Sequence, residues 1–312
     1  SMQLDIVVAF FILGAFAHFI KSDLRLPTAL YQSLTIFLLI AIGLKGGVAL
    51  ANHASISLIP QSIAIIGLGL AIPLIAFPLL SGIGHFSRTD AASISAYYGS
   101  VSVGTYAVAV AVLEARGIPY EPHFPLFLVL LEMPAIAVGI ALARSPGQKI
   151  QWRPLLHEMF CNQGIVLMAG SLLIGFWAGD QVQTVMPFFG DLFHGVLALF
   201  LLEMGVVAAS RMADIKLRAP FISAFGVVMP LVGALLGGLL AYALSFSAGG
   251  IALLAVLGAS ASYIAVPAAM KTALPKANHG VAIASSLAVT FPFNVMVGIP
   301  IYLTASQWLA SQ

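Results

Sequence analysis

Long runs of apolar residues, each bounded by a short cluster of polar or charged residues, make up nearly the whole chain. A helix that crosses a bilayer needs about 20 apolar residues. Ten runs have roughly this length, at 5–20, 28–50, 57–81, 90–113, 124–143, 160–179, 190–210, 219–245, 249–270 and 280–308. The pattern therefore predicts an all-α membrane protein with ten transmembrane helices, whose ends are defined to within a few residues.

Composition leads to the same conclusion. Of the 312 residues, 61% are hydrophobic and 8% are charged, whereas a soluble domain is about half apolar and a quarter charged. The bilayer must therefore solvate most of the side chains. The first run, residues 6–20, follows no basic segment and precedes no small-residue cleavage site, so we interpret it as a span. Because Cys161 is the only cysteine, no internal disulfide is expected.

The distribution of Lys and Arg predicts the orientation, because basic residues accumulate in cytoplasmic loops. Eleven of the thirteen fall in alternate loops, at Lys21, Arg25, Arg88, Arg144, Lys149, Arg153, Arg211, Lys216, Arg218, Lys271 and Lys276. The other loops contain only Arg116, and Lys45 lies inside a span. We therefore expect a multi-pass protein of the bacterial inner membrane with both termini in the periplasm.

The two halves of the chain resemble each other. Residues 44–49 correspond to 202–207, residues 99–102 to 259–262, and residues 132–134 with Gly139 to 290–292 with Gly298. Five spans per half is an odd number, so the second half must be inverted in the membrane. We predict a first repeat over 5–143, a cytoplasmic linker over 144–158 and a second repeat over 159–308, with the substrate near the midplane.

The fourth and ninth spans carry Gly, Pro and several hydroxyl groups in mid-membrane. Irregular backbone at this depth is tolerated only where protein buries it or a cavity adjoins it. Two helices that break here direct free amide groups and positive dipole ends at one point, which suits a small anion. Close helix packing is the better interpretation of one such segment, but two in corresponding positions favour a substrate site. The candidate substrate-binding residues are Ser100, Val101, Ser102, Gly104, Thr105, Ser260, Ala261, Ser262 and Tyr263.

Three charged residues lie within spans. Lys45 and Glu203 occupy corresponding positions of the two halves and have opposite signs, so we hypothesise an intramembrane ion pair with a structural role. Glu132 either binds a cation or is neutral. With Thr105 and Asn294 it is a candidate sodium site, although a membrane Asn more often serves helix contact.

No residue pattern indicates catalysis. The seven His lie mostly near span ends, without a carboxylate at helical spacing, so no metal enzyme is expected. No span has a His positioned to act as base for a nucleophile of the Ser-rich ninth span. Neither a Walker loop nor a dinucleotide fingerprint is present. We expect a non-enzyme with no catalytic residue, metal site, bound cofactor or nucleic-acid partner.

Several motifs occur together and in order: residues 42–47, residues 99–105, Ser210–Arg211, and residues 259–267 followed by Pro275 and Asn278. They resemble the cyanobacterial-type sodium-dependent bicarbonate transporters (the SbtA-type permeases) over residues 5–305. The resemblance implies a 5+5 inverted repeat with two broken, crossing helices, related to bile-acid carriers and sodium/proton antiporters. It also implies sodium-coupled bicarbonate symport by an elevator-like motion in a homotrimer, sometimes inhibited by a PII-like regulator. The anion then lies between residues 100–102 and 260–262, beside Thr105.

The chain departs from the cyanobacterial members at Tyr263, where they carry an acidic residue, and at Ala265 and Val266. Its linker, residues 144–158, is short and offers little disordered chain to a regulator. We expect a secondary transporter that imports bicarbonate or a similar small anion, with sodium as the co-transported ion. The alternatives are a cation/proton antiporter, a small organic-anion carrier, a non-transporting membrane sensor and an intramembrane hydrolase.

Overall fold

The computed structural model describes residues 4–144, 147 and 149–312, apart from the side chains of residues 216–219. All regular structure in these ranges is helical and includes about 80% of the residues. The first half contains α1 (Ile6–Phe19), α2 (Thr28–His53), α3 (Leu58–Pro78), α4 (Arg88–Gly99), α5 (Val103–Ala115), α6 (Phe124–Leu130) and α7 (Pro134–Ala143). The second contains α8 (Trp152–Phe160), α9 (Gln163–Ala178), α10 (Met186–Phe189), α11 (Phe193–Arg211), α12 (Ala219–Ala243), α13 (Ala248–Ala259), α14 (Ala265–Ala273), α15 (His279–Ala284), α16 (Phe291–Phe293) and α17 (Ile299–Ala310).

Eight helical segments of the described chain are long and apolar enough to cross a membrane. They are Thr28–His53, Leu58–Ile83, Arg88–Ala115, Phe124–Ala143, Gln163–Thr184, Phe193–Ile215, Pro220–Ala243 and His279–Ala310. The protein is therefore a multi-pass membrane protein. The other two predicted spans coincide with shorter apolar helices, α1 and α13, of 14 and 12 residues.

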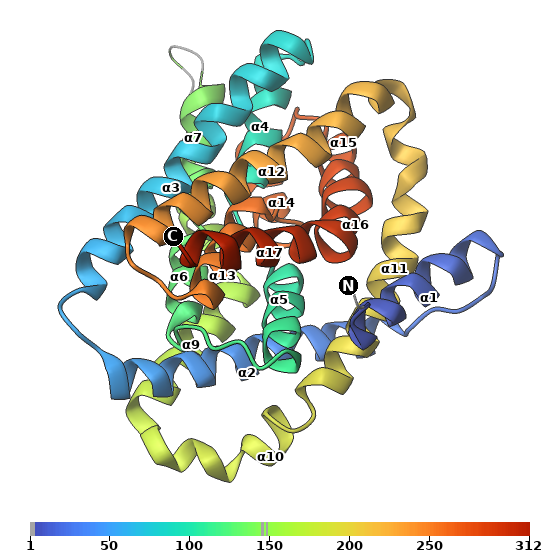
Figure 1. Ribbon diagram of the computed structural model, residues 1–312. Coiled ribbons are helices and arrows are strands. Elements are labelled where there is room, and N and C mark those ends of the chain that lie inside the picture. The colour runs from blue at the N-terminus through green and yellow to red at the C-terminus, as the bar shows by residue number, and fades with distance from the viewer. Residues whose placement is uncertain (1–3, 145–146, 148) are drawn as a thin grey trace.

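Most of the helices form two groups (Figure 1). In the first, which we call the panel, α1 packs along α11, α9 packs along α2, and α2 also contacts α11. The second, the bundle, contains α3 to α7 and α12 to α17, with α12 against α13, α4 against α7 and α13 against α17. The panel contacts the bundle where α2 meets α6 and where α11 meets α5.

Glycines bring the panel helices close together. A Cβ atom at Gly205 of α11 would lie 2.1 Å from the Phe11 carbonyl of α1, and one at Gly14 would lie 2.0 Å from the Leu202 carbonyl of α11. Likewise, a Cβ at Gly47 of α2 would lie 2.1 Å from the Leu172 carbonyl of α9. Only glycine permits backbones to approach this closely.

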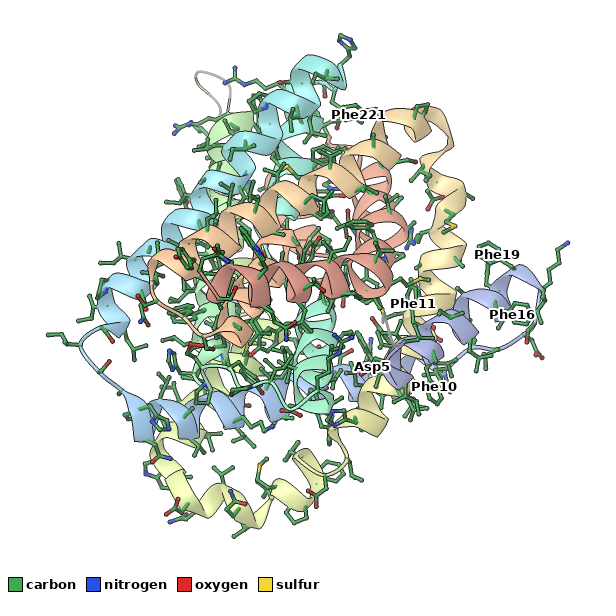
Figure 2. The ribbon with its side chains drawn as sticks, viewed as in Figure 1. Asp5, Phe10, Phe11, Phe16, Phe19 and Phe221 are labelled. Atoms are coloured by element: carbon green, nitrogen blue, oxygen red, sulfur yellow. The ribbon has the colours of Figure 1, made fainter. Side chains whose placement is uncertain are left out.

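Helix α1 has one face buried against the rest of the protein and one face exposed at the surface (Figure 2). Phe11 is buried and packs edge-to-face on Phe291 of α16, with ring centroids 5.7 Å apart. Phe16 and Phe19 point outward at the end of the helix and are exposed. Exposed Phe side chains are what a lipid-facing surface requires.

The fourth and ninth spans are both interrupted, as predicted. Helix α4 ends at Gly99 and α5 begins at Val103, with Ser100 and Ser102 in extended conformations. Helix α13 ends at Ala259 and α14 begins at Ala265. A third interruption, at residues 131–133 between α6 and α7, was not predicted.

The tenth span is a continuous helix that contains two π-helical stretches, η4 (Ser285–Thr290) and η5 (Asn294–Gly298). A further π-helical stretch, η1 (Leu79–Ile83), ends the third span. The 3₁₀ segments η2 (Gly179–Thr184) and η3 (Met212–Arg218) follow α9 and α11.

Two carboxylates join the halves at the ends of the interrupted spans. Glu121, in the loop after α5, accepts hydrogen bonds from the backbone N–H (3.1 Å) and hydroxyl (2.5 Å) of Ser247, the N-cap of α13. Asp90, in the first turn of α4, accepts one from the N–H of Asn278 (2.7 Å), which lies in the loop after α14. The start of the fourth span is therefore bonded to the loop after the ninth span, and the start of the ninth span is bonded to the loop after the fourth.

Candidate functional site

The interruptions of the fourth and ninth spans are hydrogen-bonded to each other. The N–H of Ser102 donates to Ser260 Oγ at 3.2 Å, and the N–H of Ser262 donates to the Tyr97 carbonyl at 2.8 Å. All four residues are buried. Two amides that the breaks release are thus satisfied across the contact, and the two segments form one unit.

After each interruption, a serine side chain accepts a hydrogen bond from an amide in the first turn of the next helix. Ser102 caps α5, since its Oγ accepts the Thr105 N–H at 3.2 Å. Ser262, two residues before the N-cap Ile264, accepts the Val266 N–H in the first turn of α14, also at 3.2 Å. A hydroxyl at the start of a helix satisfies one of its unpaired amides, which explains why both breaks contain serine.

A small cavity lies between these segments and the panel. Its volume is about 50 Å³. Since one water requires about 10–15 Å³ on this measure, it accommodates roughly three or four non-hydrogen atoms. It is lined by Thr35, Leu38, Leu39, Val101, Ser102, Val103, Gly104, Glu132, Gln163, Gly164, Phe200, Ser262, Tyr263, Ile264 and Ala265.

First-turn residues of both restarted helices line this cavity: Val103 and Gly104 of α5, and Ala265 of α14. The first amides of a helix have no partner within it and carry the positive end of its dipole. Two such termini beside one cavity provide hydrogen-bond donors for an anion without an Arg or Lys.

Two buried polar groups in the cavity make no hydrogen bond: Glu132 Oε2 and the Tyr263 hydroxyl. Glu132 lies in the interruption of the fifth span and is 9% exposed. Tyr263 is 7% exposed, and its hydroxyl lies so near Gly104 that a Cβ there would be 2.5 Å from it. Buried polar groups are normally paired, so both groups have capacity to bind a ligand.

The structure brings together most of the predicted substrate-binding residues. Val101, Ser102, Gly104, Ser262 and Tyr263 line the cavity. The hydroxyls of the other predicted residues are bonded to protein: Ser100 to the Glu132 carbonyl (3.3 Å), Thr105 to Ser102 Oγ (2.9 Å) and Ser260 to the Leu257 carbonyl (3.0 Å). Ala261 is buried between Ser260 and Ser262.

Sequence reasoning missed the panel side of the cavity. This side is formed by Thr35 and Leu39 of α2, Gln163 and Gly164 of α9, and Phe200 of α11. Nothing in the sequence marks these residues as functional, and only the packing of the panel on the bundle brings them here. The proline at 134 was the one available signal for the third interruption.

The three residues of the predicted sodium site do not all line this cavity. Glu132 lines the cavity, whereas Thr105 and Asn294 do not. The Thr105 hydroxyl donates to Ser102, and both polar atoms of Asn294 are engaged, by the Ala259 carbonyl and the Tyr302 hydroxyl at 2.9 Å each. Glu132 is the member of the set that has a free oxygen.

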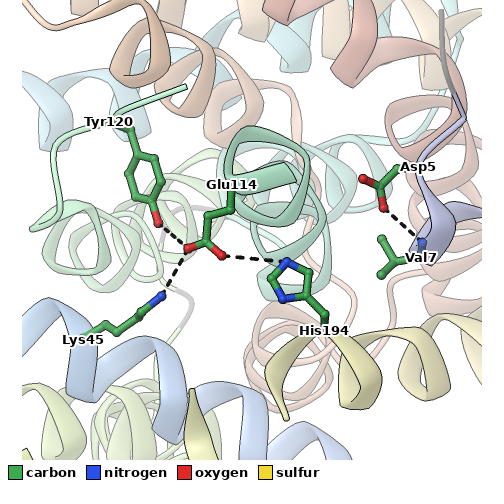
Figure 3. Close-up of polar contacts among 6 residues, drawn as sticks. All are labelled: Asp5, Val7, Lys45, Glu114, Tyr120 and His194. Carbon is green, nitrogen blue, oxygen red and sulfur yellow. Dashed lines mark hydrogen bonds and ion pairs between the residues drawn. The ribbon is translucent and has the colours of Figure 1, made fainter. Parts of the chain in front are cut away.

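The predicted ion pair between Lys45 and Glu203 is wrong. Lys45 Nζ instead lies 3.1 Å from Glu114 Oε1, which also accepts from the Tyr120 hydroxyl at 3.0 Å (Figure 3). His194 Nε2 approaches the other Glu114 oxygen at 3.7 Å. Burial, and then the Glu114 charge, raise the pKa of Tyr120 well above its usual range.

Glu203 has a different partner near the other end of α2. It accepts the Leu26 N–H at 3.0 Å, and Arg25 Nε lies 3.8 Å away. Helix α2 meets this turn of α11 at Tyr31, whose hydroxyl lies 3.3 Å from the Met204 sulfur. At 1.5 Å per residue, Tyr31 and Lys45 are about 20 Å apart along α2. Lys45 and Glu203, which match in the predicted repeat, therefore do not meet.

Residues 6–307 match the model of the Na+-dependent bicarbonate transporter superfamily. A search of curated proteins found no match. The match covers nearly the entire chain and describes a family of transporters, so the protein is a membrane transporter and not an enzyme.

Proposed function

We propose that this chain, which belongs to the Na+-dependent bicarbonate transporter superfamily, imports bicarbonate or a similarly small anion together with sodium across the bacterial inner membrane. One observation carries the proposal: two interrupted helices are bonded to each other beside a small cavity. Its volume of about 50 Å³ suits an ion such as bicarbonate, which has four non-hydrogen atoms.

The anion binds at the starts of α5 and α14 in this proposal. Amides near Gly104 and Ala265 donate to its oxygens, and Ser102, Ser262 and Tyr263 contribute hydroxyls. Tyr263 supplies a neutral donor that bears no negative charge. A neutral phenol beside the helix termini favours an anionic guest, because it adds no repulsion.

Sodium binds at Glu132. An unpaired carboxylate in the membrane interior costs about 3 kcal/mol or more, and Glu132 Oε2 has no protein partner. A bound cation offsets that cost with the oxygen ligation that sodium prefers. Anion and cation then occupy one cavity and attract each other, which is a direct physical basis for symport.

The chain crosses the membrane ten times as a 5+5 inverted repeat over 5–143 and 159–308, with a cytoplasmic linker over 144–158 and periplasmic termini. The packing of α1 on α11 and of α9 on α2 supports this proposal, since a twofold relation between halves exchanges the two pairs. Gly205 and Gly47, which correspond in the repeat, make equivalent close contacts. The loop distribution of Lys and Arg supports the orientation.

Transport proceeds by an elevator-like movement of the bundle against the panel. The cavity lies between these two groups, so such a movement changes the face to which it opens. Gln163 and Gly164 line the cavity, and they lie at the start of α9, soon after the proposed linker. The cavity therefore lies closer to the membrane face that carries the linker. A homotrimer and a PII-like regulator follow from the family resemblance alone.

The test is uptake of labelled bicarbonate into proteoliposomes at alkaline pH, where bicarbonate outweighs carbon dioxide. We expect uptake to accelerate with an inward sodium gradient and to be lost in the Ser102→Ala/Ser262→Ala double variant. Glu132→Gln should abolish the stimulation by sodium. Thr272→Ala, which removes an exposed hydroxyl bonded to its own helix, is the matched control.

Other results would support the alternatives and overturn the proposal. Sodium efflux driven by a proton gradient, without bicarbonate uptake, would indicate a cation/proton antiporter. Uptake of a small carboxylate in preference to bicarbonate would indicate an organic-anion carrier. Saturable bicarbonate binding without flux would indicate a sensor.

A further inference from the structure

Polar side chains of the tenth span bond to carbonyls of the ninth-span interruption. Asn294, which is completely buried, donates from Nδ2 to the Ala259 carbonyl at 2.9 Å. Ser286, also buried, donates from Oγ to the Ser262 carbonyl at 2.8 Å. In an unbroken helix, amides four residues further along would bond to these carbonyls. The tenth span therefore replaces hydrogen bonds that the interruption removes.

Both donors lie in π-helical stretches, Ser286 in η4 and Asn294 in η5. A π-helical turn contains an additional residue compared with an α-helical turn, and such turns are concentrated at functional sites. These stretches lie beside the interrupted helix, where their donors are needed.

The orientation of the Asn294 amide is determined by Tyr302. The Tyr302 hydroxyl donates to Asn294 Oδ1 at 2.9 Å, so Oδ1 is the acceptor and Nδ2 is left to donate to Ala259. Gly298 provides the space for this bond, since a Cβ there would lie 2.8 Å from the hydroxyl and 2.9 Å from Oδ1. The chain from Tyr302 through Asn294 to Ala259 is buried throughout.

We propose that Asn294 and Ser286 are positioning residues of the anion site, a role that rests on the function proposed above. They direct the Ala259 and Ser262 carbonyls towards the tenth span and away from the cavity. An anion is repelled by carbonyl oxygens and held by amides, so removal of these contacts weakens anion binding. Tyr302 acts through Asn294, and sodium binding depends on neither residue.

Kinetics of bicarbonate uptake into proteoliposomes, at varied bicarbonate and varied sodium, test the proposal. Asn294→Leu and Ser286→Ala should each raise the KM for bicarbonate about tenfold, and Tyr302→Phe about threefold, because each removes a buried hydrogen bond. The maximal rate and the sodium concentration for half-maximal uptake should remain within twofold. Ser306→Ala is the matched control, since its buried hydroxyl bonds only to the Tyr302 carbonyl of its own helix.

Two kinetic outcomes would overturn the proposal. A rise in the half-maximal sodium concentration, with an unchanged KM for bicarbonate, would make Asn294 a cation ligand. An equal rise in KM with Ser306→Ala would show that the effect comes from disturbed packing of the tenth span and not from loss of the bonds to the Ala259 and Ser262 carbonyls.

Hydrogen exchange separates this proposal from the proposed function, because it requires no transport. We expect amides 260–266 to exchange faster in Asn294→Leu and Tyr302→Phe than in the wild type or Ser306→Ala, each measured on monodisperse protein. Unchanged exchange would refute the positioning role. If the wild-type protein takes up no bicarbonate but the variants exchange faster, the proposal that bicarbonate is transported is refuted, and the positioning role of Asn294 and Tyr302 is not.

Discussion

Alanine at Gly205 or Gly47 tests whether the two halves of the protein pack in the same way. The two glycines correspond in the proposed repeat and lie on α11 and α2. In each case a Cβ would lie 2.1 Å from a backbone carbonyl oxygen of the neighbouring panel helix, α1 or α9. We expect both substitutions to destabilise the protein to a similar extent.

The magnitude follows from that distance. Ordinary van der Waals contact begins at 3.4 Å, so the helices must separate by more than 1 Å, and neither atom belongs to a flexible side chain. Overpacking of this kind typically costs about 1–3 kcal/mol. At about 2–4 °C per kcal/mol, each variant should lose roughly 5 °C in Tm.

Thermal denaturation of the purified protein in detergent measures the effect. Gly195→Ala on α11 and Gly170→Ala on α9 are the controls, because nothing lies within 4 Å of a Cβ at either position. Their Tm should stay constant or rise, since Ala favours helix over Gly by up to about 1 kcal/mol. Equal Tm values for Gly205→Ala and Gly195→Ala, or a loss at only one of Gly205 and Gly47, would refute equivalent packing.

Three further predictions concern the site, the charges and the loops. In Gly104→Ala the new Cβ would lie 2.5 Å from the Tyr263 hydroxyl and displace it, which should raise the KM for bicarbonate about fivefold. An unchanged KM would show that this hydroxyl does not contact the anion. Lys45→Met should lower the free energy of unfolding by less than about 1 kcal/mol, as for exposed ion pairs. Glu203→Gln should lower it by more, because Glu203 is buried. Their effects on Tm should add, because the residues do not touch; coupling above about 1 kcal/mol would contradict the structure. Burial lowers the pKa of His123 below its ordinary 6.5, so the unfolded chain binds the proton more readily and stability falls as pH drops below about 6.5. Tm should therefore decrease less between pH 7 and about pH 5.5 in His123→Phe than in the wild type, and equal decreases would contradict this reading.

The interruption of two spans could be predicted because its signals are local. Ser102 is a good N-cap, Ser262 accepts an amide of the first turn of α14, and Gly99 permits the close approach of Pro73, whose Cδ would lie 2.6 Å from a Cβ there. Apolar run length likewise identified the positions of the long helices, since bilayer thickness sets it.

The charge contacts could not be predicted, because they depend on how helices cross. Lys45 and Glu203 match in the proposed repeat, but α2 meets the Glu203 turn of α11 at Tyr31, about 20 Å from Lys45. Lys45 therefore pairs with Glu114, a residue of α5. The role of Asn294 was also hidden, because an amide can ligate a cation as readily as it bonds to a carbonyl, and only its neighbours distinguish the two.

The bonds from Glu121 to Ser247 and from Asn278 to Asp90 have a consequence for energetics. They fasten the outer ends of both interrupted spans, so in the proposed elevator mechanism these two spans move together as one unit. Any difference in anion affinity between the two orientations would then come from the panel residues that line the cavity, since the two spans carry their own groups with them. In that mechanism the ion gradients set the net direction of flux.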